Sequence, residues 1–347
     1  MARFMEVSFG EALPDGMFIF EGRIRFPEKE NAERFLMEAS RRGFYLHIAR
    51  KDGGTVRAIL LPRPGTKSSS YWINIALFVL TLLTTLAIGA MYEQVGLTEL
   101  LRQPWLILKG LPFSLSIMGI LFVHEMGHYI ASRLHGVEAT LPYFIPFPTI
   151  IGTLGAVIRI KSPIPTRKAL IDIGSAGPIA GLLAALPLAF IGLKLSSFVP
   201  KTDMGGALVL GDSILFKLIS LIAIGNPPEG YDVMLHPVAF AGWIGLFVTA
   251  LNLIPAGQLD GGHIAYALMG RWHKPFAWSF WAVLLVAGIL WPGWWLWAFV
   301  ILVFGVRHPP TLVDTVPLDT GRKALGLICF LLFILTITPV PFSILPR

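Results

Sequence analysis

The chain has 347 residues, of which 54% are apolar and only 14% are charged, and its mean hydropathy is +0.69. Because a soluble chain usually carries about 25% charged residues, this composition excludes a disordered protein and argues against an ordinary soluble enzyme. The apolar surplus lies in long blocks, which indicates a polytopic membrane protein. The single cysteine, Cys329, excludes an intrachain disulfide and a multi-cysteine metal site. The N-terminus resembles neither a signal peptide nor a transit peptide.

Residues 1–66 differ from the rest because they are rich in charge and contain no long apolar run. Apolar residues recur with helical spacing after Pro27, which predicts a helix over about 28–42. Alternating segments predict strands at Met17–Phe26, Phe44–Ala49 and Thr55–Leu61, with a turn at Asp52-Gly53-Gly54. We therefore expect a small α+β soluble domain. At this size its stability is marginal, so we expect it to rest on the membrane part or on a partner.

The remainder, residues 72–347 after a linker at 67–71, is predicted to be an all-α polytopic membrane domain with about seven spans. A spanning helix needs about 20 mostly apolar residues. The apolar block 276–307 is broken at Pro292-Gly293 and is either two spans or a helical hairpin, whereas 205–225 contains Asp212 and Lys217 and is predicted not to cross. The full spans are predicted at 72–92, 112–134, 169–193, 236–252 and 322–340.

The distribution of Lys and Arg predicts the orientation of these spans. With the N-terminal domain in the cytoplasm, 22 of the 28 Lys and Arg residues fall on the cytoplasmic side. The placement of Lys and Arg in the membrane topology therefore explains the formal charge of +7. The net positive charge is then no evidence for nucleic-acid binding. The tryptophans around 276–297 are typical of an aromatic belt at the lipid–water interface.

His124-Glu125-Met126-Gly127-His128 lies near the predicted cytoplasmic end of the second span. On a helix, residues i and i+4 share a face, so both imidazoles can bind one metal ion while Glu125 acts on its bound water. Ionisable residues inside a membrane are costly and are usually functional. The alternative is a structural polar patch that seals the end of the helix.

A third ligand is needed, because a catalytic zinc site commonly has three protein ligands and one open position. Asp260 is the best candidate, since it follows a helix break at Pro255 and Gly257 directly after the span 236–252. Non-helical backbone at membrane depth is tolerated only around a cavity. The predicted topology also brings this break to the same side as His128. The alternative role for Asp260 is the N-cap of a short helix over 261–270.

Two other histidines and a glycine series surround these candidates. His263 is a weaker ligand candidate, expected beside the metal ligands or as a cap, and His135 is expected to be an interfacial histidine. Gly174, Gly177 and Gly181 have helix-packing spacing. They are typical of generic membrane helix packing, and a close approach of the third span to the catalytic helix is compatible with it.

The two motifs and their order resemble the site-2 protease family of intramembrane zinc metalloproteases. The second motif reads Asn252-x-x-Pro255-x-x-x-Leu259-Asp260-Gly261-Gly262, and the similarity covers about residues 110–270. Gly177-Pro-Ile-Ala-Gly181 is similar to the third span of that family. Gly305-x-x-His308-Pro309-Pro310 and the N-terminal domain resemble the plant-plastid branch and its prokaryotic relatives.

This resemblance implies one zinc ion per chain, bound by His124, His128 and Asp260. It also implies that Glu125 is the general base and acid, and that Asn252 holds the substrate or the developing oxyanion. The implied activity is hydrolysis of peptide bonds within or near transmembrane segments of membrane proteins, with the catalytic core on the second to fourth spans. The active site is expected to open to the cytoplasm.

A helical substrate must unwind before its carbonyls can be attacked. The segment 141–148 is too rich in proline for a spanning helix, and 150–160 is typical of a strand or hairpin punctuated by glycine. Its edge is expected either to add the substrate as a further strand or to be a plain re-entrant plug.

A membrane metal-binding transporter without peptidase activity is the rival hypothesis, because intramembrane His and Asp would serve it too. It predicts further ionisable residues along a path through the membrane, and the predicted spans contain few. It also gives Glu125 no specific role.

Overall fold

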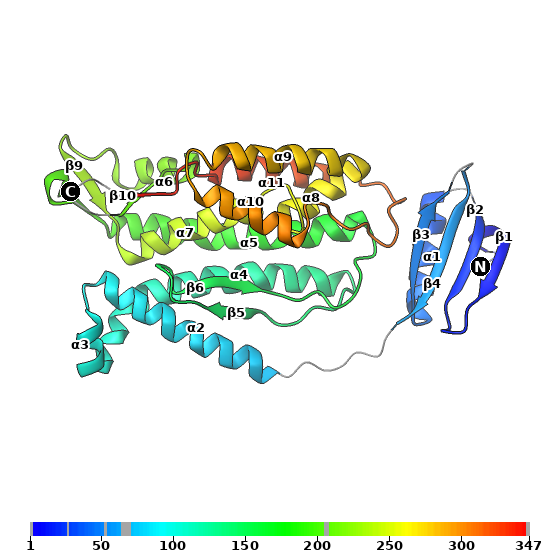
Figure 1. Cartoon of the computed structure of the whole chain (residues 1–347), viewed down its shortest axis with the longest axis horizontal. Helices are drawn as coiled ribbons and strands as arrows, with labels where there is room; N and C mark the ends of the chain where they lie inside the picture. Colours follow the sequence, from blue (N-terminus) through cyan, green and yellow to red (C-terminus); the bar gives the residue numbers. More distant parts are fainter. Residues whose placement is uncertain (1–2, 26–27, 52–53, 64–70, 205–207, 345–347) are drawn as a thin grey trace.

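The computed structural model describes residues 3–25, 28–51, 54–63, 71–204 and 208–344. The chain forms a small N-terminal sheet with one helix and a larger, mostly helical part (Figure 1). This coarse architecture confirms the sequence prediction. Pro27, the first two residues of the predicted Asp52-Gly53-Gly54 turn and the linker up to residue 70 lie outside the described residues.

The N-terminal part is an antiparallel sheet with strand order β1-β2-β4-β3. The predicted helix and three predicted strands are confirmed. Strand β1, which pairs Met5 with Ile24, was not predicted. Met5, Val7 and Phe9 alternate with polar residues in it, so a short local strand pattern was present and was missed, although only Met5 is buried. The elements are β1 (Met5–Ala12), β2 (Phe18–Ile24), α1 (Glu28–Arg41), β3 (Phe44–Arg50) and β4 (Val56–Pro62).

A distant segment completes the core of this sheet. Leu312, Val313 and Val316 are buried in the same apolar cluster as residues of α1, β3 and β4. The backbone N–H of Ile48 on β3 donates to the carbonyl of Leu312 over 2.8 Å. The expectation that the small domain rests on the membrane part is therefore confirmed.

Among the described residues of the helical part, three segments are long and apolar enough to cross a membrane. They are α2 (Tyr71–Tyr92), α5 (Arg167–Lys194) and Pro104–Leu134, which joins η2 (Pro104–Gly110) to α4 (Leu111–Leu134). The other predicted spans are shorter helices, and the block 276–307 is two helices. The remaining helices are α3 (Leu97–Arg102), η3 (Lys201–Met204), α6 (Ile214–Ile224), α7 (Pro237–Asn252), α8 (Asp260–Met269), η4 (Gly270–Trp272), α9 (His273–Ala287), α10 (Gly293–Phe304) and α11 (Thr320–Thr336).

The membrane part is not purely helical, which corrects the all-α prediction. Its described residues contain three two-stranded antiparallel ribbons. A strand or hairpin was expected only over 150–160, and the structure pairs 153–157 with 143–146, where no strand was predicted. Figure 1 shows this ribbon between α2 and α4. The strands are β5 (Tyr143–Pro146) with β6 (Thr153–Val157), β7 (Ser197–Pro200) with β9 (Tyr231–Met234), and β8 (Leu208–Leu210) with β10 (Phe342–Ile344).

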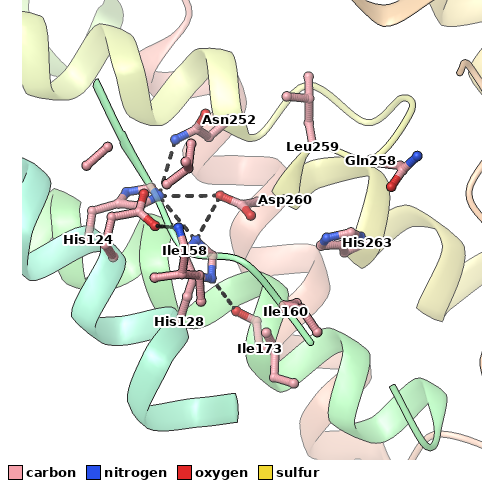
Figure 2. A pocket seen from close by; sticks show the side chains of 13 residues that line it. His124, His128, Ile158, Ile160, Ile173, Asn252, Gln258, Leu259, Asp260 and His263 are labelled. Atoms are coloured by element: carbon pink, nitrogen blue, oxygen red, sulfur yellow. Dashed lines mark hydrogen bonds and ion pairs between the residues drawn. The ribbon is translucent and has the colours of Figure 1, made fainter. Parts of the chain in front are cut away.

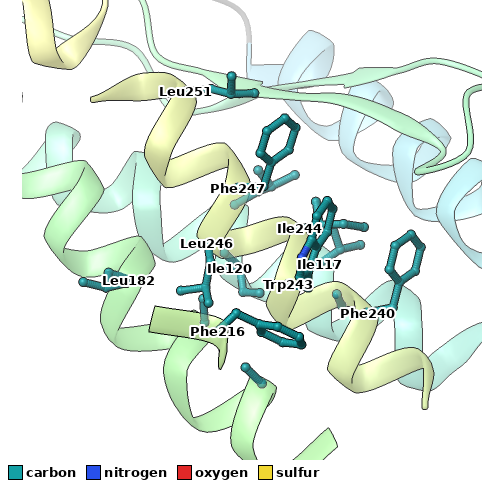
Figure 3. Packing of buried hydrophobic residues seen from close by; sticks show 14 of the residues in the cluster. Ile117, Ile120, Leu182, Phe216, Phe240, Trp243, Ile244, Leu246, Phe247 and Leu251 are labelled. Atoms are coloured by element: carbon teal, nitrogen blue, oxygen red, sulfur yellow. The ribbon is translucent and has the colours of Figure 1, made fainter. Parts of the chain in front are cut away.

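The main apolar core lies between α4, α5 and α7 (Figure 3). Trp243 of α7 is 1% exposed, stacks on Phe247 at 5.5 Å between ring centroids, and donates its indole N–H to the Gly211 carbonyl. A Cβ on Gly242 would lie 2.5 Å from the backbone nitrogen of Ala189. The two helices therefore pack with their backbones almost in contact, which fixes α7 against α5.

A cluster of charges joins three helices near the start of α5. Asp172 accepts hydrogen bonds from Arg322 of α11 over 2.6 Å and pairs with His135 at the end of α4 over 2.8 Å. Arg322 also binds Asp319, the N-cap of α11, over 2.6 Å. These pairs hold α11 against α5 and against the end of α4, the helix that carries His124 and His128.

We predict that Arg322→Ala lowers the free energy of unfolding by about 1–2 kcal/mol, because it leaves the half-buried Asp172 carboxylate without its main partner. The measurement is denaturant unfolding in detergent. Arg34→Ala is the control, since Arg34 and Glu30 are both more than 60% exposed and lie 3.9 Å apart. Equal effects of the two substitutions would contradict the prediction.

Candidate metal centre

His124 and His128 occupy successive turns of α4 and point toward α5. Both are buried, and their ring centroids lie 5.0 Å apart. The space for them comes from two glycines on α5, since a Cβ on Gly177 would lie 2.0 Å from His128 Nε2 and one on Gly181 would lie 2.8 Å from His124 Nδ1. Gly177 and Gly181 therefore make the predicted close approach to the helix that carries the two histidines, whereas Gly174 lies against His263 of α8.

Asp260 reaches the same place from the chain break between α7 and α8. Gly257 turns this segment with a positive φ of 66°, and a Cβ on Gly261 would lie 2.1 Å from the Leu253 carbonyl oxygen. Asp260 is the first residue of α8, where the positive end of the helix favours a carboxylate. The N-cap position belongs to Leu259, so the alternative of Asp260 as a cap is wrong.

The three side chains present their ligand atoms at nearly equal separations. His124 Nε2 lies 3.2 Å from His128 Nε2 and 3.4 Å from Asp260 Oδ2, and His128 Nε2 lies 3.1 Å from the same oxygen. Ligands bound at about 2.0–2.1 Å in a tetrahedral zinc site lie about 3.3 Å from one another. Among the described residues, this is the one group of three or more such side chains that could hold a metal ion.

A further contact fixes the tautomer of His128. Its Nδ1 lies 2.7 Å from the carbonyl oxygen of Ile173, which can only accept a hydrogen bond. The proton of the neutral ring is therefore on Nδ1, and the lone pair of Nε2 is directed at the centre of the group. Such outer contacts typically orient metal-binding histidines.

Glu125 lies beside this group on the same helix and is 6% exposed. Its Oε2 accepts a hydrogen bond from the backbone N–H of Ile158 over 2.9 Å. Ile158 directly follows β6, so the hairpin holds the carboxylate in place. This partner was missed in the sequence, because a backbone contact between distant segments leaves no local pattern.

Asn252, the last residue of α7, lies at the same centre. Its Nδ2 is 3.2 Å from His124 Nε2. Figure 2 shows Asn252, His124, His128 and Asp260 converging, with His263 lying farther along α8. His263 contacts His308 rather than the group, and His135 is paired with Asp172.

The group opens into a pocket of about 220 Å³. One part of its lining is polar, and another is apolar and comes from the end of β6 and the residues after it. It is lined by His124, Glu125, His128, Ala156, Val157, Ile158, Ile160, Ile173, Asn252, Gln258, Leu259, Asp260 and His263.

The model of peptidase family M50 matches residues 112–290, which include every member of this group. The chain belongs to peptidase family M50. This M50 chain is 35% identical over 242 residues to the probable chloroplastic zinc metalloprotease EGY1 of Arabidopsis thaliana, covering 67% of this chain and 43% of that protein. It is 32% identical over 298 residues to EGY2 of the same plant, covering 82% and 53%.

A third relative, the probable chloroplastic zinc metalloprotease EGY3 of Oryza sativa subsp. indica, is 31% identical over 253 residues, covering 66% of this chain and 42% of that protein. The M50 chain thus spans about half the length of the curated relatives it matches. No solved structure gives a significant match. None of these relatives is named as a transporter, so the comparisons give that rival hypothesis no support.

We predict that Gly177→Ala weakens zinc binding by about tenfold or more, because the added methyl group must displace His128. The measurement is zinc affinity by competition with a chelator. Gly119→Ala on α4 is the matched control, since nothing lies within 4 Å of its Cβ position. Unchanged affinity in Gly177→Ala would show that His128 is not held against α5 at a metal.

Proposed function

We propose that this M50 chain is an intramembrane zinc metalloprotease that hydrolyses peptide bonds within or near transmembrane segments of membrane proteins. The observation that carries the proposal is the spacing of 3.1–3.4 Å among the ligand atoms of His124, His128 and Asp260 beside a buried glutamate. The zinc metalloprotease names of the relatives support it.

Bound zinc supplies a Lewis acid and lowers the pKa of water toward neutrality. Glu125 is the general base for the attacking water and then the acid for the leaving amine. Its contact with the Ile158 N–H keeps the carboxylate at one side of the ligand group. Asn252 Nδ2 is the donor for the substrate carbonyl oxygen as negative charge develops on it.

The substrate adds as a strand along the outer edge of the segment after β6, the edge that faces away from Thr140. Arg159 bonds inward, since its carbonyl accepts from the Thr140 N–H and its N–H donates to Thr140 Oγ1. Its neighbour Ile158 directs its N–H the other way, toward Glu125. The outer edge of this strand therefore faces the ligand group, where an unwound substrate finds backbone partners. This arrangement favours strand addition over a plain re-entrant plug.

The topology that we propose has about seven spans, with the N-terminal domain and the active-site opening in the cytoplasm and the tryptophan-rich helices in contact with lipid. The bias of Lys and Arg supports it. Glu33 of α1 pairs with Lys168 at the start of α5 over 2.6 Å. The N-terminal sheet thus lies at the end of the bundle where α5 begins, beside the half of α4 that carries His128.

The proposed domains are 1–66, a linker at 67–71 and a membrane domain at 72–347 with a catalytic core at 110–270. Residues 312–316, which belong to the membrane domain in sequence, pack in the apolar core of the first domain.

We predict that Glu125→Gln lowers the cleavage rate by about 10²–10⁴-fold while zinc content stays at the wild-type level, because the amide cannot accept a proton. The assay is mass spectrometry of a labelled single-span peptide with a Gly-Pro pair in its span, in detergent with the purified chain. His135→Gln is the control, since His135 lies outside the pocket. Wild-type cleavage by Glu125→Gln would exclude this mechanism.

We also predict that Asp260→Ala loses most of its zinc after gel filtration, because one of three ligands is removed. Elemental analysis of zinc per chain is the measurement. Asp232→Ala, on β9 and outside the pocket, is the control. Undiminished zinc in Asp260→Ala would remove Asp260 from the site.

A further inference from the structure

Residues 305–316, most of the segment between α10 and α11, link the candidate metal centre to the N-terminal sheet. We call these residues the strap. In Figure 1 the strap leaves the end of α10, passes α8 and reaches β3 before the chain enters α11. Its contacts on the two sides are made by different residues.

On one side the strap holds the chain on both sides of Asp260. The Gly257 N–H donates to the Val306 carbonyl over 3.0 Å, just before α8. One turn into α8, His263 Nδ1 lies 2.6 Å from His308 Nε2. A turn later, the Tyr266 hydroxyl donates to Asp314 Oδ2 over 2.5 Å.

The protonation of His308 decides which ring donates the hydrogen bond between His263 and His308. Its Nδ1 lies 2.5 Å from the Pro309 carbonyl oxygen, which can only accept, so Nδ1 carries the proton. Burial lowers the pKa of His308 to about 3, so the ring is neutral at physiological pH. Its Nε2 is then an acceptor, and His263 is the donor. The ring of Tyr266 stacks on His308 at 4.8 Å between centroids.

On the other side the strap belongs to the N-terminal domain. Leu312 accepts the Ile48 N–H of β3, and Val313 is fully buried in the core of that domain. Val313 also donates its N–H to the Pro165 carbonyl, immediately before α5, over 2.9 Å. The sheet, the start of α5 and α8 therefore meet on one short segment.

We propose that His308 and Asp314 are positioning residues that hold α8, and with it Asp260, in register with the two histidines, and that the strap couples the seating of the N-terminal sheet to the metal centre. This inference rests on the proposed function, because it assumes a metal at His124, His128 and Asp260.

The physical reason lies in how differently the ligands are supported. His124 and His128 are fixed by the long packed helices α4 and α5, whereas Asp260 stands on α8, a helix of 10 residues entered through irregular backbone. Metal–ligand distances tolerate only about 0.2 Å of error. A small shift of α8 is therefore enough to loosen the third ligand, and the strap restrains that shift.

The test measures the zinc affinity of the purified full-length chain by chelator competition, together with the visible absorption spectrum of the cobalt-substituted protein. Tyr266→Phe removes only the hydroxyl that binds Asp314, and His308→Gln changes the acceptor for His263. We expect each variant to weaken zinc affinity by about tenfold, which is the smaller effect seen when a residue that supports a metal ligand is changed. We also expect each to shift the absorption spectrum of the cobalt-substituted protein. The double variant Tyr266→Phe/Asp314→Asn should lose no more than Tyr266→Phe alone, because both changes act on the Tyr266–Asp314 bond while the amide oxygen at position 314 still accepts the Thr311 hydroxyl.

A second pair of variants tests the link to the N-terminal sheet. Ile48→Pro removes the N–H that Leu312 accepts, and this N–H points away from the β3–β4 pairing, where proline is tolerated. Ile48→Ala is the matched control, since it loses the side chain but keeps the N–H. We expect about fivefold weaker zinc binding in Ile48→Pro than in Ile48→Ala. Glu33→Ala breaks the separate ion pair with Lys168 and should leave zinc affinity unchanged.

Affinities and cobalt spectra equal to wild type in both Tyr266→Phe and His308→Gln would overturn the positioning role. Equal affinities of Ile48→Pro and Ile48→Ala would overturn the coupling to the sheet. A wild-type chain that binds no zinc would instead overturn the proposed function, and this inference with it.

Discussion

The structure depends on one constraint, which is that three polar ligand atoms must meet between closely packed apolar helices. Their separations of 3.1–3.4 Å require the imidazoles of α4 to enter the space where a helix would normally carry side chains. Glycines at 177 and 181 leave that space on α5. Buried polar groups without partners are costly, and His128 and Glu125 are each held by a further contact, His128 by the Ile173 carbonyl and Glu125 by the Ile158 N–H.

The same constraint explains where irregular backbone appears. Two non-helical segments, the β5–β6 hairpin and the break before α8, lie against the ligand group, and protein groups satisfy their polar atoms. Asn74 of α2 donates to the carbonyls of Leu141 and Pro142, and the strap accepts the Gly257 N–H. Non-helical backbone at membrane depth is tolerated only when it is enclosed in this way. The surrounding elements therefore supply hydrogen-bond partners to the irregular backbone beside the ligand group, in addition to packing the core.

The contact between the N-terminal sheet and the strap makes the chain more integrated than its sequence suggests. The composition divides sharply after residue 66, yet the core of the first domain contains side chains from 312–316. The sheet is held at the end of the bundle where α5 begins by this shared core and by the Glu33–Lys168 pair. A domain boundary drawn along the chain is therefore not a boundary in space.

Much of the site could be predicted because its signals are local or strongly constrained. The histidines four residues apart share a helical face, and an aspartate after a proline–glycine break has few other roles in an apolar chain. Strand β1 was missed although Met5, Val7 and Phe9 alternate in it, because that pattern spans only five residues and seven of the eight residues of the strand are exposed. The roles of Ile158 and His308 were missed because they depend on hydrogen bonds to Glu125 and His263, which lie more than 30 residues away.

The sequence by itself determined that most of the chain is suited to a lipid bilayer, since this follows from its hydropathy. It also determined that the two histidines share one helix face and that the glycines of α5 have helix-packing spacing, since these follow from the 3.6-residue period of a helix. Only the tertiary structure decided that Asp260 meets the histidines, that Ile158 holds Glu125 and that the strap joins α8 to the sheet. Such contacts are set by how helices pack across long separations in sequence. Packing of that kind is a property of the whole chain, and no single segment encodes it.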